Sequence, residues 1–220
     1  MVKAYVFNGD EIAGEAAVDY TATALQLYSE LFGLPYPHQT MTVVESDFPD
    51  GMEYDGLYYL SDFYFKLYDN TPQNYLELLS VHETAHQWWF AAVANDQAIE
   101  PWLDESLATY SEYLYIERYY PELTNWWWDY RVNYYKPAGR VNLTIYDQSD
   151  LRTYINAVYL QGAVFLDQVR LALGDETFFT RLRTYTNTFN GKIATWDDFT
   201  TIMAPDPTDA IITLFQEYYK

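Results

Sequence analysis

The sequence of 220 residues contains no cysteine. Disulfide bonds, thiolate nucleophiles and cysteine-based metal sites are therefore all excluded. Any metal ion must be held by histidine, aspartate, glutamate or backbone oxygen atoms. The missing thiols do not place the protein inside or outside the cell, so the compartment stays open, with an extracytoplasmic location slightly favoured.

Basic residues are also scarce. Lys and Arg together number 12 against 32 Asp and Glu, which gives a formal net charge of −20. This charge repels phosphate backbones and no basic stripe offsets it, so we expect no nucleic acid partner. No apolar run approaches the roughly 18–20 residues that a bilayer span needs, so we expect no membrane span. Half of the residues are hydrophobic, which is ample for a sizeable core.

The pattern of apolar residues, caps and breakers predicts a mostly helical α+β domain with a small N-terminal sheet. We treat 1–220 as a single domain, with an α/β lobe over 1–94 and a helical lobe over 95–220. Strands are expected at 2–7, 40–45 and 57–60, and the stretch around 51–54 is expected in the loop between the last two. Helices are expected over 10–32, 72–94, 103–119, 122–136, 154–173, 175–189, 195–203 and 207–219.

Only three histidines occur in the chain, and two of them lie in His82-Glu83-Thr84-Ala85-His86. Residues i and i+4 lie one above the other on a helix, so both imidazole rings can reach one ion. Neutral imidazole is a common zinc ligand. Glu83 is turned by about 100° from His82, which makes it a candidate general base and not the obvious third ligand. The alternative is two core or surface histidines on an amphipathic helix.

A catalytic zinc ion needs a third protein ligand and one open position. Glu105 is our candidate, because the eighteen residues between His86 and Glu105 suffice to end one helix and bring the start of the next alongside. The alternative is a glutamate that complements the dipole of a helix start. Thr109 and Glu112 follow on the same helix face, where they either orient the zinc ligands or are ordinary polar positions.

These motifs resemble the gluzincin metallopeptidases, specifically the catalytic domain of the alanyl aminopeptidase family, peptidase family M1. The family pattern is His-Glu-x-x-His, eighteen residues and then Glu. Three other stretches are similar to family segments and occur in the family's order: 51–57 (Gly-Met-Glu-Tyr-Asp-Gly-Leu), 102–105 (Trp-Leu-Asp-Glu, like Trp-Leu-Asn-Glu) and 154–163. The resemblance implies a thermolysin-like zincin fold that binds one Zn²⁺ per chain.

By matching position, the resemblance implies a role for each motif residue. His82, His86 and Glu105 would bind zinc, and Glu83 would be the base that acts on a zinc-activated water. Tyr154 would donate a hydrogen bond to the oxyanion; core packing is the alternative for this one of 24 tyrosines.

The segment at 51–54 is implied to bind the substrate. Glu53 would pair with the free α-ammonium of a peptide, which makes the protein an aminopeptidase, and a solvated loop carboxylate is the alternative. The backbone of Gly51 and Met52 would pair with the peptide as an added strand.

The chain departs from the family pattern at several positions. Ser106 stands where the family has Gly, Asp55 where it has Pro, and Leu160-Gln161 where it has Glu-Lys. Family members generally carry an N-terminal β-rich domain and often further C-terminal helices, which are not seen in this sequence. We therefore expect a monomer that docks against such domains in a longer parent.

Two other functions stay open from the sequence. The first is a zinc endopeptidase, or another family-related hydrolase, that does not require a free amine. The second is an isolated catalytic fragment that binds zinc but is inactive without the N-terminal β domain.

Overall fold

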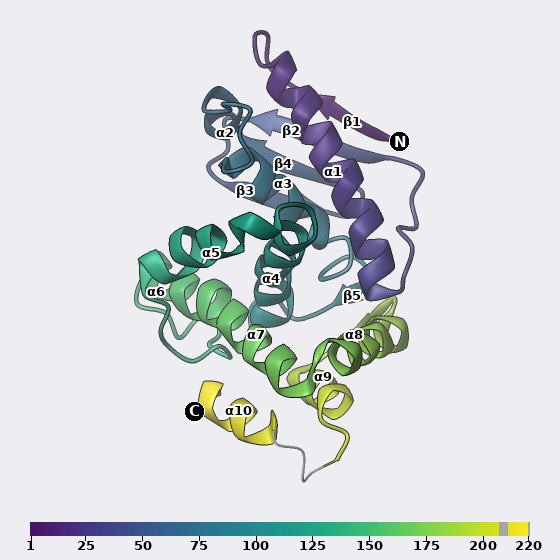
Figure 1. Cartoon of the computed structure of the whole chain (residues 1–220), viewed down its shortest axis with the longest axis vertical. Coiled ribbons are helices and arrows are strands. Elements are labelled where there is room, and N and C mark those ends of the chain that lie inside the picture. The colour runs from purple at the N-terminus through teal and green to yellow at the C-terminus, as the bar shows by residue number, and fades with distance from the viewer. Residues whose placement is uncertain (207–210, 220) are drawn as a thin grey trace.

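The computed structural model describes residues 1–206 and 211–219, and Figure 1 shows the strands of the larger sheet in the N-terminal part of the chain. The strands are β1 (Val2–Tyr5), β2 (Met41–Ser46), β3 (Gly51–Tyr54), β4 (Leu57–Ser61), β5 (Val93–Ala94) and β6 (Lys192–Ile193). The α-helices are α1 (Glu11–Phe32), α2 (Asp62–Lys66), α3 (Tyr75–Ala85), α4 (Trp102–Tyr119), α5 (Thr124–Trp126), α6 (Leu151–Tyr154), α7 (Gly162–Leu173), α8 (Asp175–Phe189), α9 (Trp196–Met203) and α10 (Ile211–Tyr218). Two 3₁₀ segments, η1 (Pro121–Leu123) and η3 (Asn133–Tyr135), and two π-helical segments, η2 (Trp127–Val132) and η4 (Ile155–Gln161), lie between them.

Four strands form one mixed sheet in the order β1-β2-β4-β3. The strands β1, β2 and β4 run parallel, and β3 pairs antiparallel with β4. The helix α1 makes the crossover between β1 and β2 that parallel neighbours require. Because β3 is at the edge of the sheet, the backbone groups on its outer side are available to another extended chain.

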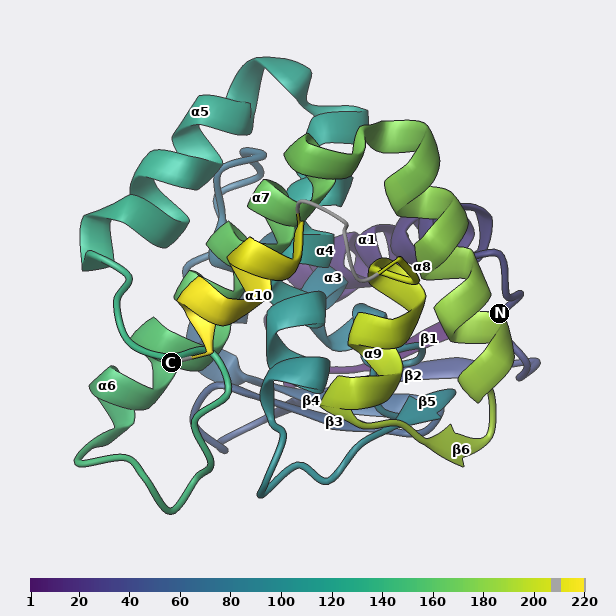
Figure 2. The ribbon, with the colours of Figure 1, turned by 90° about the horizontal axis from the view of Figure 1, so that it is seen from below.

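The sheet packs against α1 and α3, and Figure 2 shows it as a layer with most of the helices on one side. Its small core joins side chains of α1, β2, β4 and α3, among them Ala17, Val43, Tyr58 and Leu76. The larger core lies among the helices and also contains residues of α1 and α3. The α+β fold expected from the sequence is confirmed. Within the described ranges, no helix has both the length and the hydropathy to cross a bilayer.

The predicted helix over 72–94 is shorter than expected. It begins after Asn74, whose side chain accepts a hydrogen bond from the backbone N–H of Glu77 at 2.8 Å. It ends at Ala85, although neither glycine nor proline marks this point in the sequence. The chain turns there because the large side chains of Trp88 and Trp89 are buried in the helical core. Tertiary packing thus overrides local helix propensity.

Three other expectations need correction. The stretch 51–54 is the strand β3 and not a loop, because its backbone pairs with β4. The single helices expected over 122–136 and 154–173 are each interrupted by a π-helical segment, which helix periodicity does not reveal. The helix expected over 207–219 is present from Ile211, and 207–210 lie outside the described residues.

Candidate metal centre and substrate cleft

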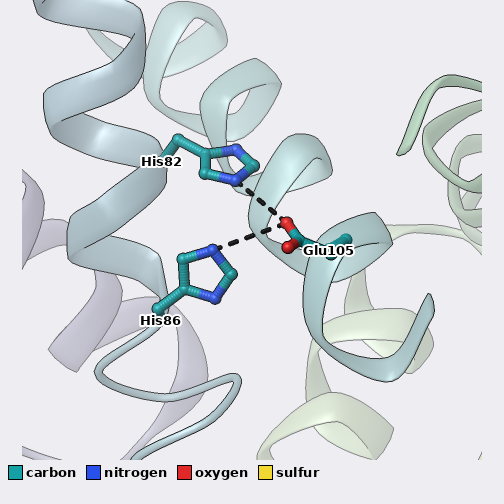
Figure 3. A group of neighbouring side chains, drawn as sticks. All are labelled: His82, His86 and Glu105. Carbon is teal, nitrogen blue, oxygen red and sulfur yellow. Dashed lines mark hydrogen bonds and ion pairs between the residues drawn. The ribbon is translucent and has the colours of Figure 1, made fainter. Parts of the chain in front are cut away.

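The two histidines and Glu105 come from neighbouring helices. His82 lies in the last turn of α3 and His86 directly follows that helix, while Glu105 lies in the first turn of α4. The helices α3 and α4 pack against each other. Figure 3 shows both imidazole rings directed at the Glu105 carboxylate.

The distances among these three side chains match a tetrahedral metal site. Oε2 of Glu105 is 3.3 Å from Nε2 of His82 and 3.6 Å from Nε2 of His86. Two ligands at about 2.0–2.1 Å from an ion, at a tetrahedral angle, are about 3.3–3.4 Å apart. The ligand atoms all lie within 4.8 Å of one another. This donor set of two imidazoles and one carboxylate fits Zn²⁺.

His82 is supported from behind by a fully buried carboxylate. Its Nδ1 is 2.8 Å from Oε1 of Glu112. The guanidinium of Arg131 donates two hydrogen bonds of 2.8 Å to Glu112, and the indole N–H of Trp127 donates a third at 3.2 Å. Burial raises the pKa of Glu112, but the charge of Arg131 and its hydrogen bonds lower it to about 2. The ionised Glu112 therefore accepts a hydrogen bond from Nδ1–H of His82 and leaves Nε2 facing Glu105.

His86 is supported by a different carboxylate. Its Nδ1 is 2.5 Å from Oδ1 of Asp104, which is also buried. The amide of Gln97, in the loop before α4, donates to Oδ2 of Asp104 at 2.6 Å. The sequence analysis did not identify Asp104 or Gln97 as site residues. Helix periodicity gives no signal for a loop residue such as Gln97 that reaches the site through a tertiary contact.

Glu83 is buried beside the ligand cluster. Its Oε2 has no hydrogen-bond partner among the described residues. Burial raises the pKa of Glu83 to about 8, although the charges of His82 and His86 act against this. A Cβ atom at Gly51 would lie 2.1 Å from Oε1 of Glu83, so the strand β3 approaches the carboxylate as closely as only glycine allows.

The cleft above the three-ligand cluster has a volume of about 450 Å³. Gly51, Met52 and Glu53 of the edge strand β3 form one wall of it, and α3 and α4 supply its floor. Oε1 of Glu53 accepts a hydrogen bond of 2.8 Å from Gln97.

Tyr159 lines this cleft, whereas Tyr154 does not. Tyr154 ends α6 and lines a separate surface pocket. The ring of Tyr159 stacks on that of His82, with 6.1 Å between the ring centroids and 3° between the planes, and Tyr159 also lies close to Glu105. The structure therefore places Tyr159, the second tyrosine of the same motif, in the cleft beside the three-ligand cluster and Tyr154 outside it.

Comparisons with known proteins agree with this geometry. A sequence model described as "Peptidase family M1 domain" matches residues 16–218. The chain belongs to peptidase family M1. The predicted family is thus confirmed.

Relatives of this M1 domain are named aminopeptidases. Aminopeptidase M1-D of Oryza sativa subsp. japonica is 28% identical over 100% of this chain and 27% of its own length. Aminopeptidase N of Lactobacillus helveticus is 29% identical over 83% of this chain and 24% of its own length. The M1 zinc metallopeptidase from Deinococcus radiodurans is similar in structure, with a TM-score of 0.71 and 25% identity over 98% of this chain and 45% of that one. The chain spans about a quarter of the curated relatives and under half of that structure.

Three remaining sequence features of the M1 domain have structural explanations. The Ser106 hydroxyl donates to the carbonyl of Val158 at 2.5 Å, within the π-helical segment η4, where the backbone bonding pattern is altered. Gly162 lets α7 pack against that serine, since a Cβ would lie 1.9 Å from its Oγ. The buried hydroxyl of Thr109 makes no hydrogen bond in the part of the chain that the structure describes, so the choice between a residue that orients the metal ligands and an ordinary helix position stays open.

Proposed function

We propose that the chain is the catalytic domain of a zinc-dependent aminopeptidase that hydrolyses the N-terminal bond of peptides. The observation that carries this proposal is the cluster of His82, His86 and Glu105 with the buried carboxylate of Glu83 beside it. The names of the M1 relatives support it.

The three ligands would hold one Zn²⁺ per chain and leave a fourth position open toward the cleft. Bound there, zinc supplies a Lewis acid that polarises a carbonyl and lowers the pKa of water. Glu112 and Asp104 hold both rings with Nε2 toward Glu105, the orientation in which the two rings and the carboxylate can share one ion.

Glu83 is the proposed general base. It takes a proton from the attacking water and delivers it to the leaving amine. Burial suits Glu83 to this role, because it raises the pKa of the carboxyl group to a value close to neutral pH. Tyr159 lines the same cleft and donates a hydrogen bond to the oxyanion that forms on the scissile carbonyl. Tyr154 lies behind it and does not reach the cleft.

Glu53 is the proposed acceptor for the α-ammonium of the peptide. It lies on β3, within 4.8 Å of ligand atoms of Glu83 and His86, so a bound ammonium would place the first peptide bond beside the base. The outer edge of β3, at Gly51 and Met52, would pair with the peptide backbone. We further propose that the chain acts as a monomer on this peptide substrate.

The decisive experiment is Glu83→Gln in the zinc-loaded chain. We expect one zinc per chain to remain by metal analysis while turnover of an aminoacyl reporter falls about 10²–10⁴-fold. Exposed Glu122→Gln is the matched control. Full turnover in Glu83→Gln, with zinc retained, would refute the proposal.

Two comparisons refine the assignment. Tyr159→Phe is expected to lower kcat by about 10²-fold, as for loss of an oxyanion donor, while Tyr154→Phe leaves it within a few-fold. Equal cleavage of free and N-acetylated peptides would indicate an endopeptidase and remove the role given to Glu53.

A further inference from the structure

Gln97 connects the amine-binding side of the cleft to the metal-binding side. It lies in the loop between β5 and α4, and its single Nε2 is 2.8 Å from Oε1 of Glu53 and 2.6 Å from Oδ2 of Asp104. Asp104 in turn contacts Nδ1 of His86 through Oδ1. One amide group therefore joins Glu53 to the carboxylate that supports His86.

The two carboxylates of Glu53 and Asp104 determine the orientation of the Gln97 amide. An amide NH₂ has two hydrogens, and here each finds a carboxylate oxygen. In the flipped orientation of the amide, its carbonyl oxygen would face the two carboxylates in place of the NH₂ group. Asp104 suits this arrangement because both of its oxygens accept, one from His86 and one from Gln97, whereas an asparagine there would have only one acceptor.

The neutrality of Gln97 matters for the substrate. A lysine or arginine in its place would neutralise Glu53 and compete with a substrate ammonium. Gln97 holds Oε1 of Glu53 without cancelling its charge, and Oε2 makes no hydrogen bond to another residue in the described ranges. That oxygen remains for an ammonium group.

We propose that Gln97 is a positioning residue that holds Glu53 in place to receive the α-ammonium of the peptide. The inference rests on the proposed aminopeptidase function and extends it, since it names what orients the amine-binding carboxylate. Gln97 itself is exposed, but its amide also supports the buried Asp104, so the test must report on the metal-binding side as well.

The test is Gln97→Met, which keeps the length of the side chain and removes both donors. For a substrate with a free amine, we expect KM to rise about tenfold, the effect of losing a hydrogen bond to a charged group, while kcat stays within about twofold. Zinc content should remain at the wild-type value. Gln73→Met, at an exposed position outside the cleft, is the control and should leave KM unchanged.

A readout that needs no activity accompanies the kinetics. In ¹⁵N-labelled protein, the Gln97 side-chain amide signals are identified by their absence in Gln97→Met. They should shift in Glu53→Gln and stay in place in Glu122→Gln. An unchanged KM in Gln97→Met, or amide signals that do not respond to Glu53→Gln, would overturn the proposal.

The two readouts separate this inference from the function on which it rests. If the wild-type chain cleaves free and N-acetylated peptides equally, the aminopeptidase assignment fails and the role of Gln97 toward an ammonium fails with it. If the wild-type chain discriminates but Gln97→Met keeps its KM, only the Gln97 inference fails.

Discussion

The two histidines of the metal centre are supported by carboxylates that are held in different ways. Glu112, behind His82, is fixed by the guanidinium of Arg131 and the indole of Trp127, all on helical segments. Asp104, behind His86, is fixed by one neutral amide from an exposed loop.

The support of His82 is held by a buried ion pair, whereas the support of His86 is connected through Gln97 to Glu53 in the cleft. Arg131 compensates the charge of Glu112 inside the protein, so this carboxylate remains ionised although it is fully buried. Asp104 has no arginine or lysine among its hydrogen-bond partners in the described part of the chain. Its partner Gln97 also donates a hydrogen bond to Glu53, so a change on this side reaches the residue that we propose to bind the substrate amine.

Removing the cation on the first side should have the largest effect. In Arg131→Met the buried charge of Glu112 loses its partner, which typically lowers the free energy of unfolding by about 3–5 kcal/mol. Zinc affinity should also fall about 10–100-fold, because His82 loses a fixed support. Denaturant unfolding and competition with a zinc chelator measure the two effects. Exposed Arg118→Met is the control, and equal stability of the two variants would show that the pair is not needed.

Glu77, in the first turn of α3, is a buried carboxylate without an arginine partner within residues 1–206 and 211–219, and its pKa can be compared with that of Glu112. Glu77 is also fully buried, but its Oε1 accepts a hydrogen bond of 3.1 Å from the neutral hydroxyl of Tyr115. Burial raises its pKa to about 7, and hydrogen bonds from Tyr115 and Tyr120 only partly offset this. Both carboxylates are fully buried, so the opposite direction of the pKa shift of Glu112 comes mainly from Arg131, with His82 adding to it.

This contrast predicts the pH dependence of stability. Between the unfolded pKa of Glu77, about 4.5, and its folded pKa of about 7, the folded state binds more protons than the unfolded state. Stability contributed by the protonated form is therefore lost as pH rises through this window. Glu77→Gln should raise the free energy of unfolding at pH 8 by up to about 3 kcal/mol and by much less at pH 4.5. Unfolding curves at the two pH values test this, and an equal change at both would contradict it.

The sequence was sufficient for the parts of the site that lie on regular helices. The i, i+4 spacing of His82 and His86 places both rings on one face, and Glu105 and Glu112, seven residues apart on α4, share a face for the same reason. The period of the α-helix places each pair on one face, and the eighteen residues between His86 and Glu105 allow the two helices to lie side by side.

The rest of the site depends on irregular backbone segments that the sequence pattern does not predict. Tyr154 and Tyr159 are five residues apart, which is about 140° around an α-helix, but the intervening π-helical turn changes which of them faces the cleft. Arg131 likewise reaches Glu112 from the π-helical segment η2. Gln97 meets Glu53 across 44 residues of chain through a loop, and periodicity carries no signal for such a contact.

The smallest expected effect on stability is on the second side of the metal centre. Asp104→Asn leaves no arginine without a partner, but its single acceptor oxygen serves only one of the two donors, so the free energy of unfolding should fall by about 1 kcal/mol. Zinc affinity should fall about tenfold, since a neutral oxygen supports His86 less strongly than a carboxylate. The equivalent change on the first side, Glu112→Gln, leaves Arg131 buried and unpaired and should cost several times more stability. Parallel unfolding and zinc-competition measurements of the two variants decide the matter, and an equal loss of stability in both would mean that the two supports are held in the same way after all.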